Sequence, residues 1–262
     1  DCKTSPDTNV TWSRKGTYLP KQHLIFLNGS LVIQNASSSY SGTYICATKS
    51  DSRSLQLQES LVIIGNLSCS HIKAGYPFLT SGNYTIDPDG EGGEEPFEVY
   101  CDMKDNDGLT EVSHDIEERS PVKGCKALAC YERKVTYKGA TQAQLGNLIQ
   151  VSTHCEQFVM FECNGSLSFI SERAAWWVSR DGKPRYYWGG ATPNSKKCAC
   201  GMTNSCVGGG ECNCKSRGPV GWRSDSGKLT EITRLPVSAF RFSDIGNGKG
   251  FYSLGKLKCY GT

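Results

Sequence analysis

Ser41-Gly42-Thr43-Tyr44-Ile45-Cys46 is the stretch that decides the fold of the first part of the chain. Its β-branched and aromatic residues predict a strand, and four further short apolar runs lie around it, at Val10–Trp12, Leu24–Phe26, Leu31–Ile33 and Leu61–Ile64. Asn28-Gly29, between two of these runs, is a strong hairpin signal. No helical period of 3.6 residues is visible in residues 1–65. Short strands separated by polar turns predict an all-β sandwich here.

Cys2, Trp12 and the Ser-Gly-Thr-Tyr-Ile-Cys stretch together resemble the immunoglobulin family. The resemblance implies a Cys2–Cys46 disulfide between the sheets, with Trp12 packed on it and Tyr44 as the tyrosine-corner residue. Tyr40 stands where the family usually has Asp, so a common salt bridge is expected to be missing. Because the first Cys of this fold lies on the second strand, residues 1–65 are expected to lack strand A. Truncation of the chain and donation of a strand by another chain both remain open.

Residues 66–262 have a different organisation, with twelve of the fourteen cysteines and little helical pattern. The boundary is predicted near Gly65-Asn66, and the linker is very short. Gln142–Val151 and Ser171–Trp177 are the predicted short helices. The remainder is predicted as strands and glycine-rich loops such as Gly208-Gly209-Gly210, which indicates an α+β fold with irregular loops.

Several motifs of this second part follow one another in a recognisable order. They are Ser81-Gly82-Asn83-Tyr84-Thr85-Ile86-Asp87-Pro88-Asp89-Gly90-Glu91-Gly92, Val99-Tyr100-Cys101, His154-Cys155-Glu156-Gln157, Trp188-Gly189-Gly190, Cys198-Ala199-Cys200-Gly201, Cys212-Asn213-Cys214, Leu235-Pro236-Val237 and Leu257-Lys258-Cys259-Tyr260-Gly261. This series resembles the fibrinogen-like domain of the contactin-associated proteins, which belong to the neurexin superfamily. The resemblance spans nearly all of residues 67–261 and implies a fibrinogen C-terminal-like α+β domain at 66–262.

A weaker resemblance, chiefly around Gly82–Cys101, reaches the C-propeptides of fibrillar collagens. The contactin-associated proteins place a discoidin-type domain where this chain has residues 1–65. We therefore do not carry their axonal functions over to this chain.

The resemblances imply only part of the disulfide pairing. The fibrinogen-like resemblance implies Cys69–Cys101, the collagen-propeptide resemblance implies Cys163–Cys259, and spacing favours Cys125–Cys130. The pairing of the remaining six cysteines stays open at the level of sequence: Cys155, Cys198, Cys200, Cys206, Cys212 and Cys214.

Cysteine content and sequons indicate an extracellular location, either as a secreted protein or as the ectodomain of a membrane protein. Fourteen cysteines in 262 residues fit an oxidising compartment. Six Asn-x-Ser/Thr sequons predict N-linked glycans at Asn9, Asn28, Asn35, Asn66, Asn83 and Asn164. The longest aliphatic run is far short of the roughly 20 residues of a membrane span, so no membrane insertion of this segment is expected. A net charge of +3 does not indicate nucleic-acid binding.

Neither a zinc site nor catalysis is favoured by the sequence. The cysteines between 198 and 214 are separated in pairs by one residue, whereas zinc ligands prefer two to four, so disulfides are expected. None of the four histidines forms a His-x-x-x-His pair, and Gly-x-Ser-x-Gly and phosphate-loop motifs are absent from the sequence. The aromatic group Trp176, Trp177, Tyr186, Tyr187 and Trp188, near Arg180 and Arg185, fits a packed core better than a contact surface.

An acidic stretch is the sharpest chemical feature. From Asp87 to Asp102 the chain carries seven carboxylates without a Lys or Arg between them, and calcium prefers carboxylate and carbonyl oxygens. Ile86-Asp87-Pro88-Asp89 matches the opening of the calcium loop of the collagen propeptides. That resemblance implies a calcium site with Asp87 and Asp89 as side-chain ligands, Gly90 and Gly92 as carbonyl ligands, and Glu95 in the place of a family Asp.

The expected function is therefore extracellular adhesion or recognition through contacts with another protein or with copies of this chain, as part of a receptor or matrix protein. Two alternatives remain. One is a secreted structural protein that assembles into oligomers or filaments, and the other is a lectin-like recognition factor. Fold alone does not choose among them.

Overall fold

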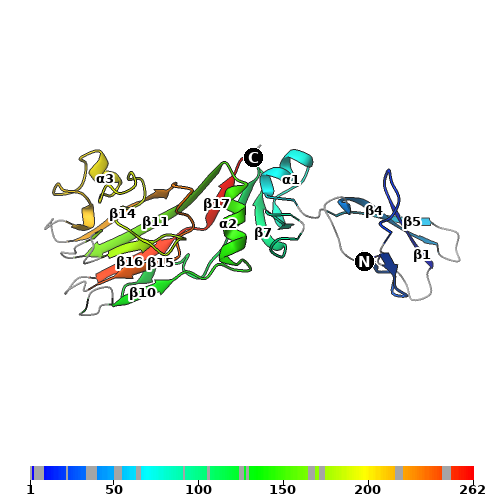
Figure 1. Cartoon of the computed structure of the whole chain (residues 1–262), viewed down its shortest axis with the longest axis horizontal. Coiled ribbons are helices and arrows are strands. Elements are labelled where there is room, and N and C mark those ends of the chain that lie inside the picture. The colour runs from blue at the N-terminus through cyan, green and yellow to red at the C-terminus, as the bar shows by residue number, and fades with distance from the viewer. Residues whose placement is uncertain are drawn as a thin grey trace. The chain divides into compact units, whose positions relative to one another are not determined.

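The computed structural model describes most of the chain (Figure 1). The residues outside its description are 1, 3–8, 22, 34–39, 50–54, 63–65, 91, 105–106, 124–126, 128–129, 165–168, 171–174, 216–220 and 244–248. No helix among the described residues is long and apolar enough to cross a membrane.

The chain forms two compact units. One consists of Asp1–Leu67 together with Thr85–Pro96, and the other consists of Ser68–Tyr84 together with Phe97–Thr262. The acidic loop, residues 87–95, is thus grouped with the first unit, although it follows the first helix of the second unit along the chain.

The first unit contains five described strands in two sheets. They are β1 (Asn9–Arg14), β2 (His23–Ile25), β3 (Leu31–Ile33), β4 (Gly42–Lys49) and β5 (Leu55–Val62). β4 pairs with β1 on one side and β5 on the other, while β2 and β3 form the hairpin predicted around Asn28-Gly29. Residues 1–65 were expected to lack strand A, and this expectation stays a prediction, because Cys2 is the one described residue before β1.

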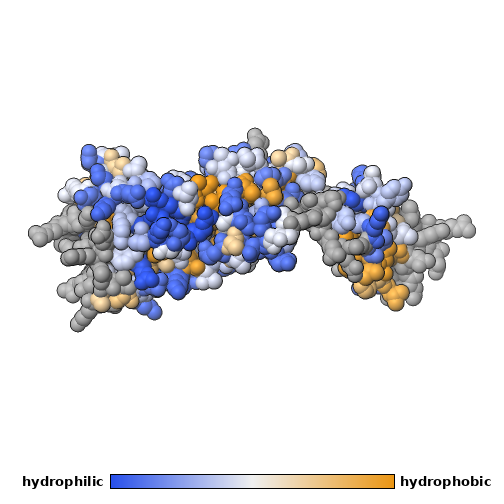
Figure 2. All heavy atoms as spheres, viewed as in Figure 1, coloured by the Kyte–Doolittle hydropathy of each residue, from blue (hydrophilic) through white to orange (hydrophobic). Residues whose placement is uncertain are grey.

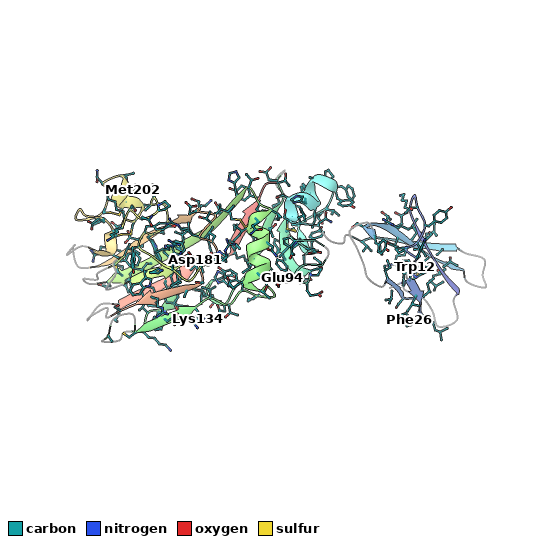
Figure 3. All side chains as sticks on the ribbon, viewed as in Figure 1. Trp12, Phe26, Glu94, Lys134, Asp181 and Met202 are labelled. Atoms are coloured by element: carbon teal, nitrogen blue, oxygen red, sulfur yellow. A yellow bond between two sulfur atoms is a disulfide. The ribbon has the colours of Figure 1, made fainter. Side chains whose placement is uncertain are left out.

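Trp12 and Tyr44 tie the parts of this unit together. Trp12 lies directly opposite Cys46 in the β1–β4 register, and its indole Nε1 donates to the carbonyl oxygen of Gly29, 3.0 Å away, in the β2–β3 turn. The buried Tyr44 hydroxyl donates to the carbonyl oxygen of Tyr40 at 2.7 Å. Figure 3 shows Trp12 inside the unit and Phe26 at its surface.

The second unit is built mainly of strands, with short helices. Its helices are α1 (Cys69–Gly75), α2 (Gln142–Gln150), α3 (Ala199–Met202) and the 3-10 turn η2 (Asn213–Lys215). Its strands are β6 (Gly82–Ile86), whose last two residues group with the first unit, β7 (Phe97–Asp102), β8 (Leu109–Val112), β9 (Ser120–Pro121), β10 (Tyr131–Lys134), β11 (His154–Asn164), β12 (Ala175–Val178), β13 (Pro184–Arg185), β14 (Trp222–Leu229), β15 (Ala239–Phe242), β16 (Lys249–Leu254) and β17 (Leu257–Tyr260).

These strands form a large and a small sheet. The large sheet has the order β6-β7-β8-β17-β11-β16-β9, with β14 paired to β11, and the small one has the order β10-β15-β12-β13. Alternate residues of β11 are buried, which places Phe161 against Phe242 of the small sheet with ring centroids 5.5 Å apart. Burial of alternate residues on both sheets is what a packed two-layer core requires.

One of the two predicted helices is confirmed. Helix α2 begins with a capping box, in which the Thr141 hydroxyl accepts from Gln144 N–H and the Gln144 side chain accepts from Thr141 N–H. The helix predicted over Ser171–Trp177 is wrong where the structure describes it, because residues 175–178 form strand β12. There Trp177 is buried while Trp176 is half-buried, and the cross-strand pairing with β15 overrides any local helical preference.

Six disulfides are described, and one prediction needs correction. The pairs are Cys2–Cys46, Cys69–Cys101, Cys155–Cys259, Cys163–Cys214, Cys198–Cys212 and Cys200–Cys206. The predicted Cys163–Cys259 bridge is wrong, because β11 and β17 are in a register that sets Cys155, and not Cys163, opposite Cys259. Cys125 lies outside the described residues, so its predicted bridge to Cys130 stays a prediction.

A buried polar network holds the inner side of β11. The Gln157 side chain is fully buried, accepts from Val237 N–H at 3.0 Å and donates to the carbonyl oxygen of Gly255 at 3.1 Å. Nε2 of buried His114 lies 2.9 Å from the same carbonyl oxygen, while its Nδ1 accepts from Ile116 N–H at 3.2 Å. His114 therefore donates through Nε2 and accepts through Nδ1, which is the neutral form of the ring.

Burial lowers the pKa of His114 below its ordinary value of about 6.5. Below that ordinary value the unfolded chain binds a proton that the folded protein resists, so the free energy of unfolding should fall as pH drops from about 7 to 5. In His114→Gln this slope should be smaller. Burial also lowers the pKa of His71. The variant His71→Gln should therefore reduce the same slope, and it serves for comparison with His114→Gln. Urea unfolding across this pH range measures the slope, and a His114→Gln curve parallel to wild type would contradict the expectation.

Candidate recognition site

The predicted calcium ligands of the acidic loop differ in burial and in their hydrogen-bond partners. Asp87 is buried and its N–H donates to the carbonyl oxygen of Asn66 at 2.8 Å. Asp89 is exposed, and its Oδ2 accepts from the N–H of Glu94 at 2.8 Å. Gly90 and Gly92 have φ of 75° and 86°, in the left-handed region that favours glycine. Glu95 is exposed, and Glu91 lies outside the described residues.

Within the described residues, this loop does not bring three carboxylate, histidine or cysteine ligand atoms within 4.8 Å of one another. The Asp89 carboxylate is instead turned back onto the loop backbone. Calcium also accepts backbone carbonyl oxygens as ligands, and the two glycines with positive φ shape a tight turn that can present them. Calcium at this loop therefore stays a proposal.

The aromatic group predicted as core is largely core. Trp177, Tyr187 and Trp188 are buried, and the indole of Trp177 donates to the carbonyl oxygen of Tyr187 at 2.9 Å. Trp176 and Tyr186 are half-buried, with ring centroids 5.9 Å apart. Most of the aromatic area therefore stabilises the small sheet and is not presented to a ligand.

The cysteine-rich segment 188–215 covers the free edge of β14. Gly190 N–H donates to the carbonyl oxygen of Lys228 at 2.9 Å, and the Asn213 side chain donates to the carbonyl oxygen of Ser224 at 2.9 Å. Backbone groups at a sheet edge that are paired in this way do not template the addition of another strand. The approach is close: a Cβ at Gly189 would lie 2.2 Å from the carbonyl oxygen of Gly227.

A surface pocket of about 410 Å³ lies between this segment and β14. Its described lining consists mostly of small or polar residues: Gly190, Ala199, Cys200, Met202, Thr203, Ser205, Asn213, Ser224, Asp225 and Ser226. Figure 3 shows Met202, the last residue of α3, at this end of the second unit. Four hydroxyls, one amide and one carboxylate surround the space, and no histidine, lysine or arginine is among the described lining residues. Such a lining suits hydrogen bonding to a polar ligand.

Asp225 is the buried polar centre of the site. Its Oδ1 accepts from Asn213 N–H at 3.0 Å and its Oδ2 accepts from Cys214 N–H at 2.8 Å, at the first residues of η2. Burial raises the pKa of the Asp225 carboxyl, and the two backbone donors oppose that rise. The carboxylate thus fixes the position of the cysteine-rich segment against β14.

Cys198, Cys212 and Asp225 place their side-chain atoms within 4.8 Å of one another, a geometry that could suit a metal ion. Cys198 and Cys212 are however joined in a disulfide. A disulfide sulfur is no thiolate, and the thiolate is the form of cysteine that binds zinc. The group is therefore a structural bridge, as the one-residue spacing of the cysteines predicted.

The sequence predicted disulfides within the cysteine-rich segment, but neither its place along β14 nor the pocket. The cysteine spacing indicated a stapled loop, whereas Asp225 is one of 26 acids and stands in an unremarkable Ser-Asp-Ser run. In β14, exposed residues alternate with more buried ones, and Asp225 stands at a buried position. The sequence WRSDSGKL is too polar to show this alternation of burial, so Asp225 could not be singled out.

Comparison with known proteins gives relatives for this chain, although no family model matches it. The chain is similar to contactin-associated protein 1 of Mus musculus, with 37% identity over 187 residues, 69% of this chain and 13% of the relative. Contactin-associated protein 1 of Homo sapiens is 36% identical over 188 residues, 70% of this chain and 14% of the relative. Neurexin-4 of Drosophila melanogaster is 35% identical over 208 residues, 74% of this chain and 16% of the relative. The chain thus spans less than a fifth of the length of these relatives.

Replacing Asp225 tests its role in the site. In Asp225→Ala the buried N–H of Cys214 and the partly buried N–H of Asn213 lose their acceptor, so the free energy of unfolding should fall by about 1–3 kcal/mol. Ser224→Ala, at the neighbouring exposed position, should stay within about 0.5 kcal/mol of wild type. Urea unfolding at neutral pH measures both variants. Equal stability of the two would mean that Asp225 does not hold the cysteine-rich segment in place.

Proposed function

We propose that this chain is an extracellular adhesion or recognition segment that acts through protein–protein contacts, within a cell-surface receptor or a matrix protein. The observation that carries the proposal is the 37% identity to contactin-associated protein 1, a protein named for its association with another protein. The six described disulfides support the extracellular location, because such bridges persist in oxidising compartments.

We further propose an immunoglobulin-like domain at residues 1–65 and a fibrinogen C-terminal-like domain at 66–262. The first assignment is supported by Cys2–Cys46, by Trp12 opposite Cys46, and by the hydrogen bond of Tyr44 to a backbone carbonyl four residues upstream. The second is supported by the ordered series of motifs and by the Cys69–Cys101 pair.

The Asp225 pocket is the proposed contact point on the second unit. Its hydroxyl groups and amide can exchange hydrogen bonds with a polar segment of a partner, while the disulfides hold its walls in place before binding. Preorganisation of this kind reduces the conformational entropy lost on association.

A binding screen tests the proposal. The secreted chain, multimerised on beads, is tested against a library of ectodomains displayed on cells. Ser226→Arg, which puts a long side chain into the pocket, should reduce binding to the captured ectodomain at least tenfold. Ser253→Arg is the matched control, because both serines lie directly opposite Met160, on either side of β11. Binding that Ser226→Arg leaves unchanged would remove the pocket from the proposal.

Two specific observations favour the alternatives. The hydroxyl-lined pocket also suits a sugar, and binding on a glycan array without any ectodomain bound would favour the lectin-like function. The first unit exposes Leu24, Ile25, Phe26, Leu27 and Val32, visible as an apolar area in Figure 2. An apolar area on the β2–β3 hairpin favours self-association. Light scattering on the secreted chain would show this as an oligomer.

Calcium binding to the acidic loop is a separate proposal, with Asp87, Asp89, Gly90, Gly92 and Glu95 as ligands. We expect millimolar calcium to raise the melting temperature of the wild type by a few degrees, about the effect of a ligand at many times its Kd. The Asp87→Ala/Asp89→Ala variant should show no such rise, and magnesium should have less effect because it demands a stricter geometry. Unchanged melting of the wild type in calcium would exclude the site.

A further inference from the structure

The outer face of β14, β11 and β16 carries an aromatic cluster that the recognition site does not use. These three strands lie side by side in the second unit (Figure 1). Trp222 is 51% exposed, and its ring centroid is 5.5 Å from that of Phe251. The guanidinium carbon of Arg119 lies 3.3 Å from the Phe251 centroid and 5.6 Å from the Trp222 centroid, and Arg119 also pairs with Glu162. Such stacking of a cation on two rings fixes their orientation.

Asn164 lies on the same face as this cluster. It is the last residue of β11 and stands directly opposite Trp222 on β14 and Lys249 on β16. Residues directly opposite in an antiparallel pair project their side chains to the same side of the sheet, about 5 Å apart. The buried residues of β11 alternate with Glu162 and Asn164, so the half-buried Asn164 side chain lies on the outer face of the sheet. Asn164-Gly165-Ser166 is a sequon.

We propose that Asn164 carries an N-linked glycan whose first sugar packs on the exposed ring of Trp222. In this reaction Asn164 Nδ2 bonds to C1 of an N-acetylglucosamine, the amide loses a proton, and the lipid pyrophosphate of the oligosaccharide donor leaves. The C–H face of the sugar ring is apolar and flat, and it removes aromatic surface from water as another side chain would. Arg119 holds Phe251 and Trp222 as one platform beside the attachment point.

The register between β11 and β14, which sets Asn164 opposite Trp222, favours a glycan over a docked protein on the Trp222 ring. Tryptophan beside arginine is also the composition of a protein-binding hot spot. A bulky glycan attached one cross-strand step from Trp222 fills the space that a docked protein surface would need. The glycan is covalently attached to the chain beside Trp222. Its packing on the ring therefore costs no translational entropy. The inference rests on the proposed extracellular function, since N-glycans are added along the secretory route.

Glycopeptide mapping and melting curves of the protein secreted from mammalian cells test the proposal. Asn164→Gln and Ser166→Ala both remove the sequon, and each should lower the melting temperature by about 2–4 °C. Trp222→Thr, which keeps a strand-forming residue, should lower it similarly, and Asn164→Gln/Trp222→Thr should lower it no further than either change alone. Trimming with an endoglycosidase that leaves one N-acetylglucosamine should preserve the stability.

The control is Asn83→Gln, at an exposed sequon whose side chain contacts Glu98, and its effect should simply add to that of Trp222→Thr. Additive shifts for Asn164→Gln and Trp222→Thr would overturn the packing. A bare Asn164 in a protein glycosylated at other sequons would overturn this inference and leave the extracellular function standing. A protein with no glycan at any sequon would overturn this inference and count against the extracellular function as well.

Discussion

Strand β11 is the constraint on which the second unit depends, because its backbone is paired along both edges. β14 runs along one edge, and β16 followed by β17 runs along the other. Its inner face contributes Gln157, Val159 and Phe161 to the core, and two of its cysteines form bridges to β17 and to η2. Both the pocket and the outer face take their geometry from this one strand.

The cysteine-rich segment shows how position is maintained where apolar burial is scarce. Between 198 and 214 the chain is mostly small and polar, and it offers little surface for a hydrophobic core. Three disulfides and the Asp225 carboxylate hold it against β14 instead. Disulfides restrict the unfolded chain, and carboxylate hydrogen bonds satisfy backbone donors that would otherwise be buried without acceptors. A rigid polar pocket results, which a larger apolar core would have filled.

Most strands of the first unit were predictable because local signals agree there: β-branched and aromatic residues, and Asn28-Gly29 at a hairpin. The last strand was predicted at Leu61–Ile64, whereas β5 begins at Leu55 and residues 63–64 lie outside the described residues. Helix α2 was equally predictable from its pattern. The segment Ala175–Val178 was not, since its strand state comes from pairing with β15, which is more than 60 residues away in sequence. The Cys155–Cys259 bridge depends on the register between β11 and β17. The spacing of cysteines in the sequence does not reveal the register of strands that lie far apart along the chain.

The same register has a mechanical consequence. β17 is held to β11 by only three residue pairs, and hydrogen bonds at the end of a short strand can be peeled apart one at a time. Cys155 and Cys259 form the middle pair and are covalently joined. Tension applied to the chain beyond Cys259 therefore reaches β11 through a covalent bond, and β17 cannot be peeled from the sheet past that point while the bridge is intact. Without the Cys155–Cys259 bridge, no covalent bond would join β17 to β11 against such tension.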